Sequence, residues 1–127
     1  MKTLGIGIDI TDNIRIKKSI TNKKFLSRIF SNIEINNSKK INNKTGYFSK
    51  RFAAKEAFSK ALGTGLRKGL NFNDISIIND RYGKPFIKIN PKLNNIFNKR
   101  FKTKKIKVFL SISDEKNHSV AFVVLGK

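Results

Sequence analysis

Residues 48–65, FSKRFAAKEAFSKALGTG, predict a long helix around which the rest of the chain packs. At about 100° per residue, the phenylalanines, alanines and leucine point around nearly the whole circumference, and a helix that is apolar almost all round is usually buried. Gly63 and Gly65 mark its end, because glycine readily adopts the left-handed conformation that terminates helices. We therefore expect a buried helix from about Thr45 to Leu62.

Residues 4–11, LGIGIDIT, alternate with the two-residue period of a β-strand. One face carries Leu4, Ile6, Ile8 and Ile10, and the other carries Gly5, Gly7, Asp9 and Thr11. We expect the leucine and isoleucine face to be buried. The glycine face leaves the backbone bare, so another group can approach it closely.

Shorter patterns predict the remaining elements. Residues 13–30 are strongly basic and place apolar side chains at helical spacing from Phe25 to Phe30, with Thr21 as the candidate N-cap. SNIE at 31–34 has the form of a capping box. Residues 72–78 and 85–89 predict two strands joined by the turn NDRYGK, and residues 105–113 and 119–126 predict a second hairpin. This mixed order indicates a single α+β domain over residues 1–127, with antiparallel strands packed on the long central helix.

The net charge of the chain is +20, with only eight acidic residues among 127. Such an excess of positive charge indicates a polyanionic partner, which can be a nucleic acid, an acidic protein or a phosphate-rich substrate. Lysines greatly outnumber arginines, whereas specific recognition of bases or phosphates favours the planar guanidinium. A basic nucleic-acid-binding module therefore stays as the alternative function, and we expect no nucleic-acid partner.

Composition also excludes several classes of site. The chain has no cysteine, so disulfides, zinc–thiolate sites and thiol nucleophiles are absent. Asp9 and Thr11 interrupt the apolar N-terminal stretch before it reaches the length of a signal-peptide core. No stretch approaches the roughly 20 apolar residues that span a bilayer. We expect a cytoplasmic protein without a membrane partner.

Glu56 is the only acid in residues 48–65, and it lies between Phe52 and Ala53 in helical projection. A carboxylate at such a position must meet a cation or lose several kcal/mol on desolvation. An i,i+4 ion pair with Lys60 meets this need and contributes only a few tenths of a kcal/mol. Asp9 is also unusual within a strand, although a strand-end acid that hydrogen-bonds the next turn explains it. Each acid alone has an ordinary structural explanation.

Taken together, Asp9 and Glu56 indicate a metal site. Both lie on elements predicted to be buried, beside glycine or alanine, in a chain with few acids. Mg²⁺ prefers one or two protein carboxylates and completes its shell with water and phosphate oxygens. Lys60 and Arg51 would then contact a polyanion. The residues predict Mg²⁺, a phosphate-rich ligand and a basic docking face, but they identify no reaction.

Three segments carry a resemblance to a known family. GIGIDIT at 5–11, RFAAKEAFSKALGTG at 51–65 and LSISDEKNHSVAFVVL at 110–125 closely resemble holo-[acyl-carrier-protein] synthases, the small bacterial 4′-phosphopantetheinyl transferases. Weaker matches at 28–34, 70–77 and 82–87 connect them, so the resemblance covers nearly the whole chain in order. It implies the α+β fold of that family.

The resemblance also implies a reaction. In this family the 4′-phosphopantetheine arm of coenzyme A moves to a serine of the acyl carrier protein, which releases adenosine 3′,5′-bisphosphate and serves fatty acid biosynthesis. The family's metal ligands are the aspartate of GID and the glutamate of AAKEA, here Asp9 and Glu56. Lys60 matches a lysine near the pyrophosphate, so Glu56 and Lys60 are the expected catalytic residues, with Arg51 as further cationic support for coenzyme A. The proton of the carrier serine can go to Glu56 or to a metal-bound water.

Other matches concern coenzyme A and the carrier protein. Gly83, Lys84 and Pro85 resemble the family's adenosine-side turn, although a plain hairpin turn explains them equally. The docking positions for the acidic carrier protein are Arg15, Lys24 and Arg28.

One position departs from the family pattern. Many members have histidine after the SIS segment, and this chain has Asp114, which we count with the coenzyme-A-binding positions. This difference argues against a histidine base and favours a metal-centred mechanism. His118 receives no role. The family further implies a homotrimer with active sites at the subunit interfaces.

Overall fold

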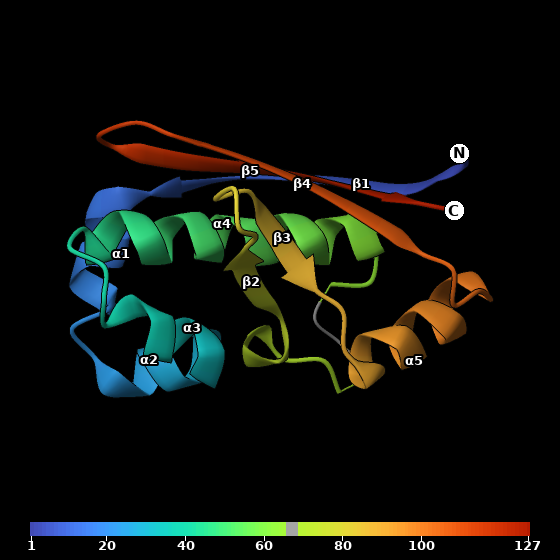
Figure 1. Cartoon of the computed structure of the whole chain (residues 1–127), viewed down its shortest axis with the longest axis horizontal. Helices are drawn as coiled ribbons and strands as arrows, with labels where there is room; N and C mark the ends of the chain where they lie inside the picture. Colours follow the sequence, from blue (N-terminus) through green and yellow to red (C-terminus); the bar gives the residue numbers. More distant parts are fainter. Residues whose placement is uncertain (66–68) are drawn as a thin grey trace.

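The structure is a computed structural model that describes residues 1–65 and 69–127. A three-stranded antiparallel sheet of order β1–β5–β4 forms one layer, built from Thr3–Asp12, His118–Gly126 and Lys107–Asp114. Helix α4, Lys44–Leu62, runs beneath this sheet along most of its length (Figure 1). A two-stranded sheet pairs β2, Ser76–Asn79, with β3, Pro85–Lys88. The predicted α+β architecture on a central helix is confirmed.

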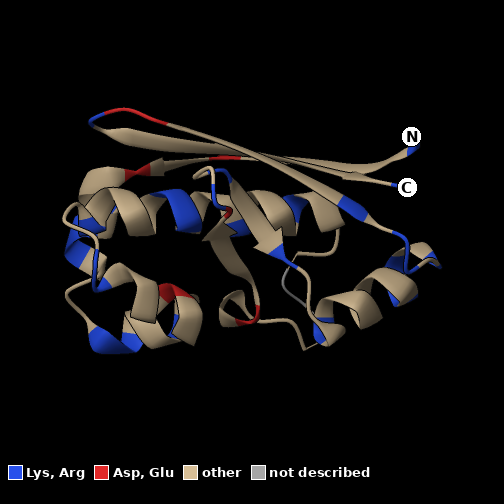
Figure 2. Cartoon of the chain, in the orientation of Figure 1, with Lys and Arg blue, Asp and Glu red and all other residues tan. Residues whose placement is uncertain are grey.

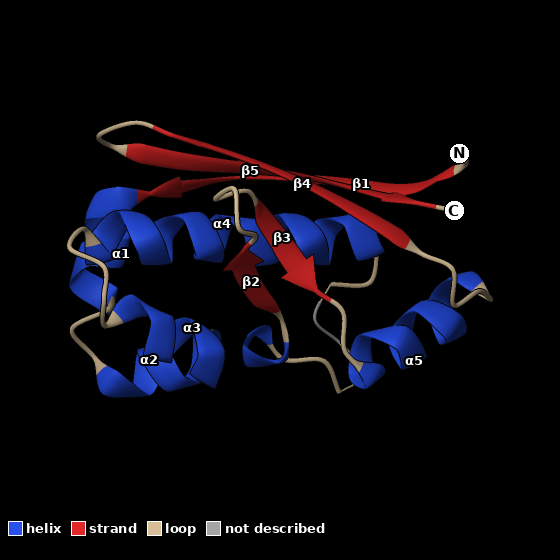
Figure 3. Cartoon of the chain, in the orientation of Figure 1, coloured by secondary structure: helices blue, strands red, loops and turns tan. Residues whose placement is uncertain are grey.

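The other helices are short and lie around α4 (Figure 3). They are α1 Asn13–Ser19, α2 Lys23–Ile29, α3 Asn32–Ser38, the 3₁₀ helix η1 Phe72–Asp74 and α5 Pro91–Phe101. The side chain of Asn22, and not Thr21, caps α2 by accepting hydrogen bonds from the backbone of Lys24 and Phe25. The capping box predicted at Ser31 and Glu34 opens α3. No helix in the described ranges has the length and apolarity needed to span a membrane.

Two predictions of secondary structure were incomplete. Residues 72–74 form η1, so the strand predicted from residue 72 begins only at Ser76. Helix α5 was not predicted, although Asn90 followed by Pro91 is a recognisable N-terminal signal. Its apolar side chains Leu93 and Phe97 are buried in the main core.

The predicted orientation of β1 was wrong. Ile6, Ile8 and Ile10 are 62%, 58% and 65% exposed, whereas Gly5 and Gly7 face the backbone of α4. A methyl group at Gly7 would collide with the carbonyl oxygen of Ala57 in α4. The missing side chains therefore let α4 pack directly on the strand, and the glycine face becomes the buried one.

The buried apolar side chains form two clusters, one on each half of α4. The larger cluster joins the C-terminal half of α4 to β2, β3, α5 and the three-stranded sheet. The smaller cluster joins the N-terminal half of α4 to α1 and α2 through Ile16, Phe30, Tyr47 and Phe48. Because α4 contributes to both clusters, its roll and axial position are fixed along its whole length.

Candidate active site

Asp9 and Glu56 meet at a surface cavity of about 250 Å³ between β1, α1 and α4. The packing of Gly7 against Ala57 explains how they come together. Gly5 packs against Ala61 and Gly7 against Ala57, so β1 and α4 run in opposite directions. Asp9 lies two residues beyond Gly7, about 6.6 Å further along the strand, and therefore beside the part of α4 that precedes Ala57 and contains Glu56. The cavity is lined by Asp9, Ile10, Thr11, Asp12, Arg15, Ile16, Phe52, Glu56 and Lys60.

Lys60 interacts with the strand and not with Glu56. Its Nζ lies 3.5 Å from Oδ1 of Asp9 and donates a hydrogen bond of 2.9 Å to the carbonyl oxygen of Ile8. Asp9 also accepts a hydrogen bond of 2.9 Å from the hydroxyl of Thr11. Within residues 1–65 and 69–127 Glu56 has no ion pair, so the intrahelical Glu56–Lys60 pair weighed from the sequence is not formed.

The electrostatics of the cavity favour a bound cation. Burial raises the pKa of Glu56, the neighbouring Asp9 carboxylate raises it further, and Lys60 and Arg15 act in the opposite direction. A raised pKa means that the ionised form lacks sufficient compensation from the protein. Glu56, with this deficit and with the Asp9 carboxylate beside it, fits a site for Mg²⁺, which takes few protein ligands. No group of three or more potential ligands occurs in the described part of the chain, so water and substrate oxygens would complete the shell.

Arg51 lies outside this cavity, in a second group of residues. Its side chain is buried, with the guanidinium 3.7 Å from the centroid of the Tyr47 ring. It donates hydrogen bonds of 3.3 Å to the carbonyl oxygen of Tyr47 and to Oδ1 of Asn79. Burial lowers the pKa of Arg51. Asn79 pairs with Pro85 across the β2–β3 hairpin, so Arg51 belongs with the hairpin residues.

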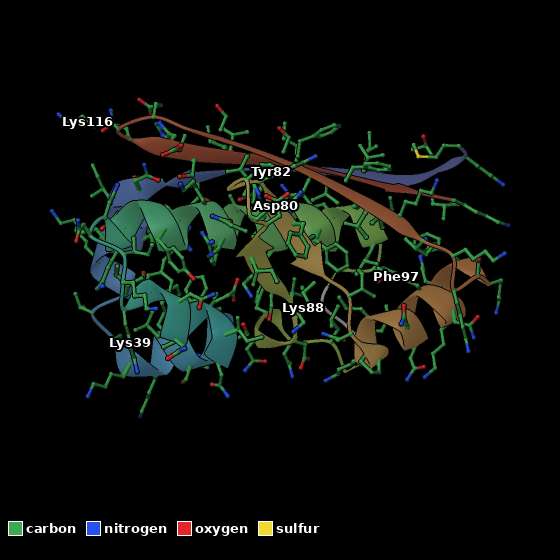
Figure 4. The ribbon with its side chains drawn as sticks, viewed as in Figure 1. Lys39, Asp80, Tyr82, Lys88, Phe97 and Lys116 are labelled. Atoms are coloured by element: carbon green, nitrogen blue, oxygen red, sulfur yellow. The ribbon has the colours of Figure 1, made fainter. Side chains whose placement is uncertain are left out.

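The β2–β3 turn holds the other predicted coenzyme-A residues. The carboxylate of Asp80 accepts hydrogen bonds from the backbone of Tyr82 and Lys84, at 2.8 and 2.9 Å. Gly83 has a φ of +84°, a conformation that favours glycine. Figure 4 shows Asp80 and Tyr82 together at this turn. Asp80 was not singled out from the sequence, although an aspartate three residues before a turn glycine is a known turn signal.

Asp114 also lies away from the cavity, at the end of β4. It pairs with Ser119, which in turn pairs with Thr11 of β1. Two strand spacings, about 10 Å, therefore separate the backbone of Asp114 from the cavity wall. His118 pairs instead with Glu115, at 3.0 Å between Nδ1 and Oε1.

The three predicted docking residues lie on the exposed surfaces of α1 and α2. Arg15 borders the carboxylate cavity, whereas Arg28 borders a separate hollow of about 450 Å³ with Ile29 and residues 70–73. Lysine and arginine positions are frequent along α1 and α2, as the blue segments of the ribbon in Figure 2 show. Sequence reasoning missed Phe52, which lines the carboxylate cavity and stacks on Phe72 with ring centroids 6.1 Å apart. Its place one turn before Glu56 in α4 was the available signal.

Comparison with known proteins shows which proteins this chain resembles in sequence and in fold. The family model of the 4′-phosphopantetheinyl transferase superfamily matches residues 5–123. The holo-[acyl-carrier-protein] synthase of Pelagibacter ubique is 58% identical over 127 residues, covering 100% of this chain and 99% of that protein. The crystal structure of the synthase from Neisseria meningitidis has a TM-score of 0.87 at 38% identity, and the match covers 98% of this chain and 99% of that chain. The Helicobacter pylori synthase in complex with coenzyme A has a TM-score of 0.76 at 34% identity, over 95% of this chain and 99% of that one.

These matches extend over nearly the full length of the chain and agree in sequence and in fold. The chain therefore belongs to the holo-[acyl-carrier-protein] synthases, a family of 4′-phosphopantetheinyl transferases.

Proposed function

We propose that this chain transfers 4′-phosphopantetheine from coenzyme A to a serine of an acyl carrier protein in the cytoplasm, with Mg²⁺ as cofactor. The observation that carries this proposal is the cavity in which Asp9 and Glu56 face each other beside Lys60 and Arg15. A relative from Helicobacter pylori is described in complex with coenzyme A, which supports that substrate. The serine hydroxyl forms a bond to the phosphorus that bears the pantetheine, and the pyrophosphate bond breaks to release adenosine 3′,5′-bisphosphate.

The residues of the cavity have distinct roles in this reaction. Asp9 and Glu56 would hold Mg²⁺, which when bound neutralises charge on the pyrophosphate. Lys60 is half-exposed and its ammonium group can turn from Asp9 toward a phosphate oxygen, which places positive charge where negative charge develops. Glu56 is also a candidate acceptor for the proton of the carrier serine, because its carboxylate lines the same cavity.

The predicted homotrimer would bring the second group of residues to this cavity. Within one chain, Arg51 and the β2–β3 turn lie outside the carboxylate cavity, so a neighbouring subunit would have to supply them. The outer face of the three-stranded sheet offers the contact surface, since large apolar side chains are exposed there. They are Ile6, Ile8, Ile10, Phe109 and Phe122.

An Ile8→Asp substitution tests this assembly. It places a charge in the middle of the exposed isoleucine row, and we expect a monomer with activity reduced by about tenfold or more. Light scattering coupled to size-exclusion chromatography measures the mass, and the same change at an exposed isoleucine of α3, Ile33→Asp, serves as control because this residue lies away from the sheet. A wild-type protein that is monomeric at micromolar concentration would contradict the trimer.

The basic surface of α1 and α2 would dock the acidic carrier protein. Arg15, Lys24 and Arg28 are exposed there and are available to carboxylates. Such contacts mainly raise the rate of association and weaken with salt. Arg15 borders both this surface and the carboxylate cavity, so a carrier bound to α1 lies next to the reacting groups.

Intact-mass spectrometry of an apo-acyl carrier protein is the direct test. Incubation with the wild-type chain, coenzyme A and Mg²⁺ should add one phosphopantetheine, and EDTA should abolish the addition. Raising the salt concentration should increase the KM for the carrier. Absence of any mass shift with several carrier proteins would refute the proposed reaction, and tight salt-sensitive binding of DNA or RNA would then favour the nucleic-acid alternative.

A further inference from the structure

Glu34 of α3 and Lys55 of α4 form an ion pair inside the protein. Both side chains are 0% exposed, and Nζ of Lys55 lies 2.7 Å from Oε1 of Glu34. In a chain of eight acids and net charge +20, one carboxylate is thus completely enclosed and unavailable to solvent. Neither residue lines the carboxylate cavity, so the proposed reaction does not use them directly.

Hydrogen bonds satisfy both partners and join four elements. Lys55 also donates to the carbonyl oxygens of Phe72 in η1 and Ile75 just before β2, which uses all three of its protons. Glu34 accepts from the backbone N–H of Ser31 at 2.9 Å and from that of Ile77 in β2 at 3.0 Å. The pair therefore locks α3, η1 and β2 onto one point of α4.

Stability alone does not explain such an arrangement. Replacing a buried ion pair by apolar side chains is often neutral or stabilising, because desolvation of the charges offsets their attraction. An ion pair that is completely satisfied does, however, specify one geometry of the elements that it joins. Lys55 directly precedes Glu56 in α4, so an ion pair that fixes the rotation of the helix at Lys55 also fixes the direction of the Glu56 carboxylate.

The 3₁₀ helix η1 extends this coupling to the docking surface. The ring of Phe72, whose carbonyl binds Lys55, stacks on Phe52 in the wall of the carboxylate cavity. The next residue, Asn73, donates a hydrogen bond of 3.1 Å to the carbonyl oxygen of Ser27 in α2. One continuous set of contacts thus runs from α2 through η1 and Lys55 to α4.

We propose that the Glu34–Lys55 pair is a positioning device, which sets the carrier-docking helix α2 relative to Glu56. This inference rests on the proposed transferase function. A carrier protein held on α2 must present its serine to the carboxylate cavity, and an error of about 1 Å can cost about a hundredfold in rate. Glu34 and Lys55 are positioning residues and touch no reacting atom.

Glu34→Gln tests the proposal with minimal change of volume. The amide presents a donor where the carboxylate accepted hydrogen bonds, so Lys55 or one backbone N–H loses its partner. We expect kcat to fall about tenfold or more and the carrier KM to rise, while the KM for coenzyme A stays within about twofold. A merely structural role would lower the melting temperature without this division between the two substrates.

Lys92→Met is the matched control. Lys92 also binds η1, through an ion pair of 2.8 Å with Asp74, but it does so from the solvent side. Its loss should leave both KM values within about twofold of the wild-type values. If Glu34→Gln does not fold, Asn73→Ala tests the proposal instead, because it removes the hydrogen bond between η1 and α2. We expect the KM for the carrier to rise about threefold and the KM for coenzyme A to stay unchanged.

The outcomes separate this inference from the proposed function. A wild-type chain that transfers no phosphopantetheine refutes the function itself. An active wild type combined with a folded Glu34→Gln variant of unchanged kinetics overturns the positioning role, as does an unchanged Asn73→Ala variant where Glu34→Gln is unfolded. A selective loss in carrier kinetics with unchanged coenzyme A kinetics supports it.

Discussion

Glu56→Gln is expected to lower kcat by about 10³-fold while the chain stays folded. The amide is isosteric with the carboxylate but carries no charge, so it binds Mg²⁺ weakly and cannot accept a proton. Of the two proposed metal ligands in the cavity, Glu56 is the one held by the central helix and carries two proposed roles. Single-turnover mass spectrometry of the carrier protein, with saturating coenzyme A and Mg²⁺, measures the loss.

The same substitution should stabilise the metal-free protein. The pKa of Glu56 is raised in the folded state, so its stabilising contribution is present below the ordinary value of 4.5 and is lost as pH rises through the folded pKa. Glutamine cannot ionise and escapes this loss. Near neutral pH in EDTA we expect the melting temperature of Glu56→Gln to exceed that of the wild type, and the difference should vanish below pH 4.5.

Two further variants are compared with Glu56→Gln, one at the other proposed metal ligand and one at an exposed acid as a control. Asp9→Asn should also abolish turnover, because it removes the other proposed metal ligand. Glu115→Gln changes an exposed acid in the β4–β5 turn and should keep kcat within about twofold. Wild-type turnover by Glu56→Gln would disprove the metal assignment, and a lower melting temperature would disprove the electrostatic deficit.

The carboxylate pair was predictable from the sequence because its two members stand out locally. Asp9 interrupts an apolar strand, and Glu56 interrupts a helix that is apolar almost all round. The structure places both at one cavity. The i,i+4 spacing in the helix predicts an ion pair between Lys60 and Glu56. In the structure Lys60 interacts instead with Asp9 and with the carbonyl oxygen of Ile8 in β1.

Interactions between distant segments were not predictable. The capping box of Ser31 and Glu34 is a local pattern, but the third and fourth interactions of Glu34, with Lys55 and Ile77, depend on the packing of α3 against α4 and β2. Arg51 contacts Tyr47 one turn earlier in α4, which is a local contact, and only the tertiary structure places it against Asn79. The periodicity of apolar residues shows which side chains share a face of a helix or strand, but it does not show which other element packs against that face.

Strand β1 shows the same limit in a different form. Alternation correctly divided the strand into two faces, but hydrophobicity assigned the wrong one to the interior of the chain. Glycine has no side chain to bury, yet it permits the closest packing of two backbones. A second subunit packed on this face would bury the exposed isoleucines and so account for the alternating pattern.

Gly7→Ala should destabilise the fold by about 3 kcal/mol or more, a large fraction of the stability of a small domain. The added methyl group would meet the backbone of α4 at the Ala57 carbonyl oxygen and lie 2.7 Å from the Ala61 nitrogen. Backbone atoms inside a helix cannot turn away as a flexible side chain can, so α4 as a whole must shift from β1. Such a shift would separate Glu56 from Asp9, and any folded fraction should be inactive.

Urea denaturation followed by circular dichroism measures the change in unfolding free energy, with the exposed strand residue Ser111→Ala as a control for substitutions in the same sheet. The test is discriminating because alanine has the higher intrinsic propensity for regular structure, so without the collision Gly7→Ala would be neutral or stabilising. A variant as stable as the wild type would mean that β1 and α4 do not pack backbone to backbone. The placement of Asp9 opposite Glu56 depends on that packing, so the carboxylate cavity would then need a different explanation.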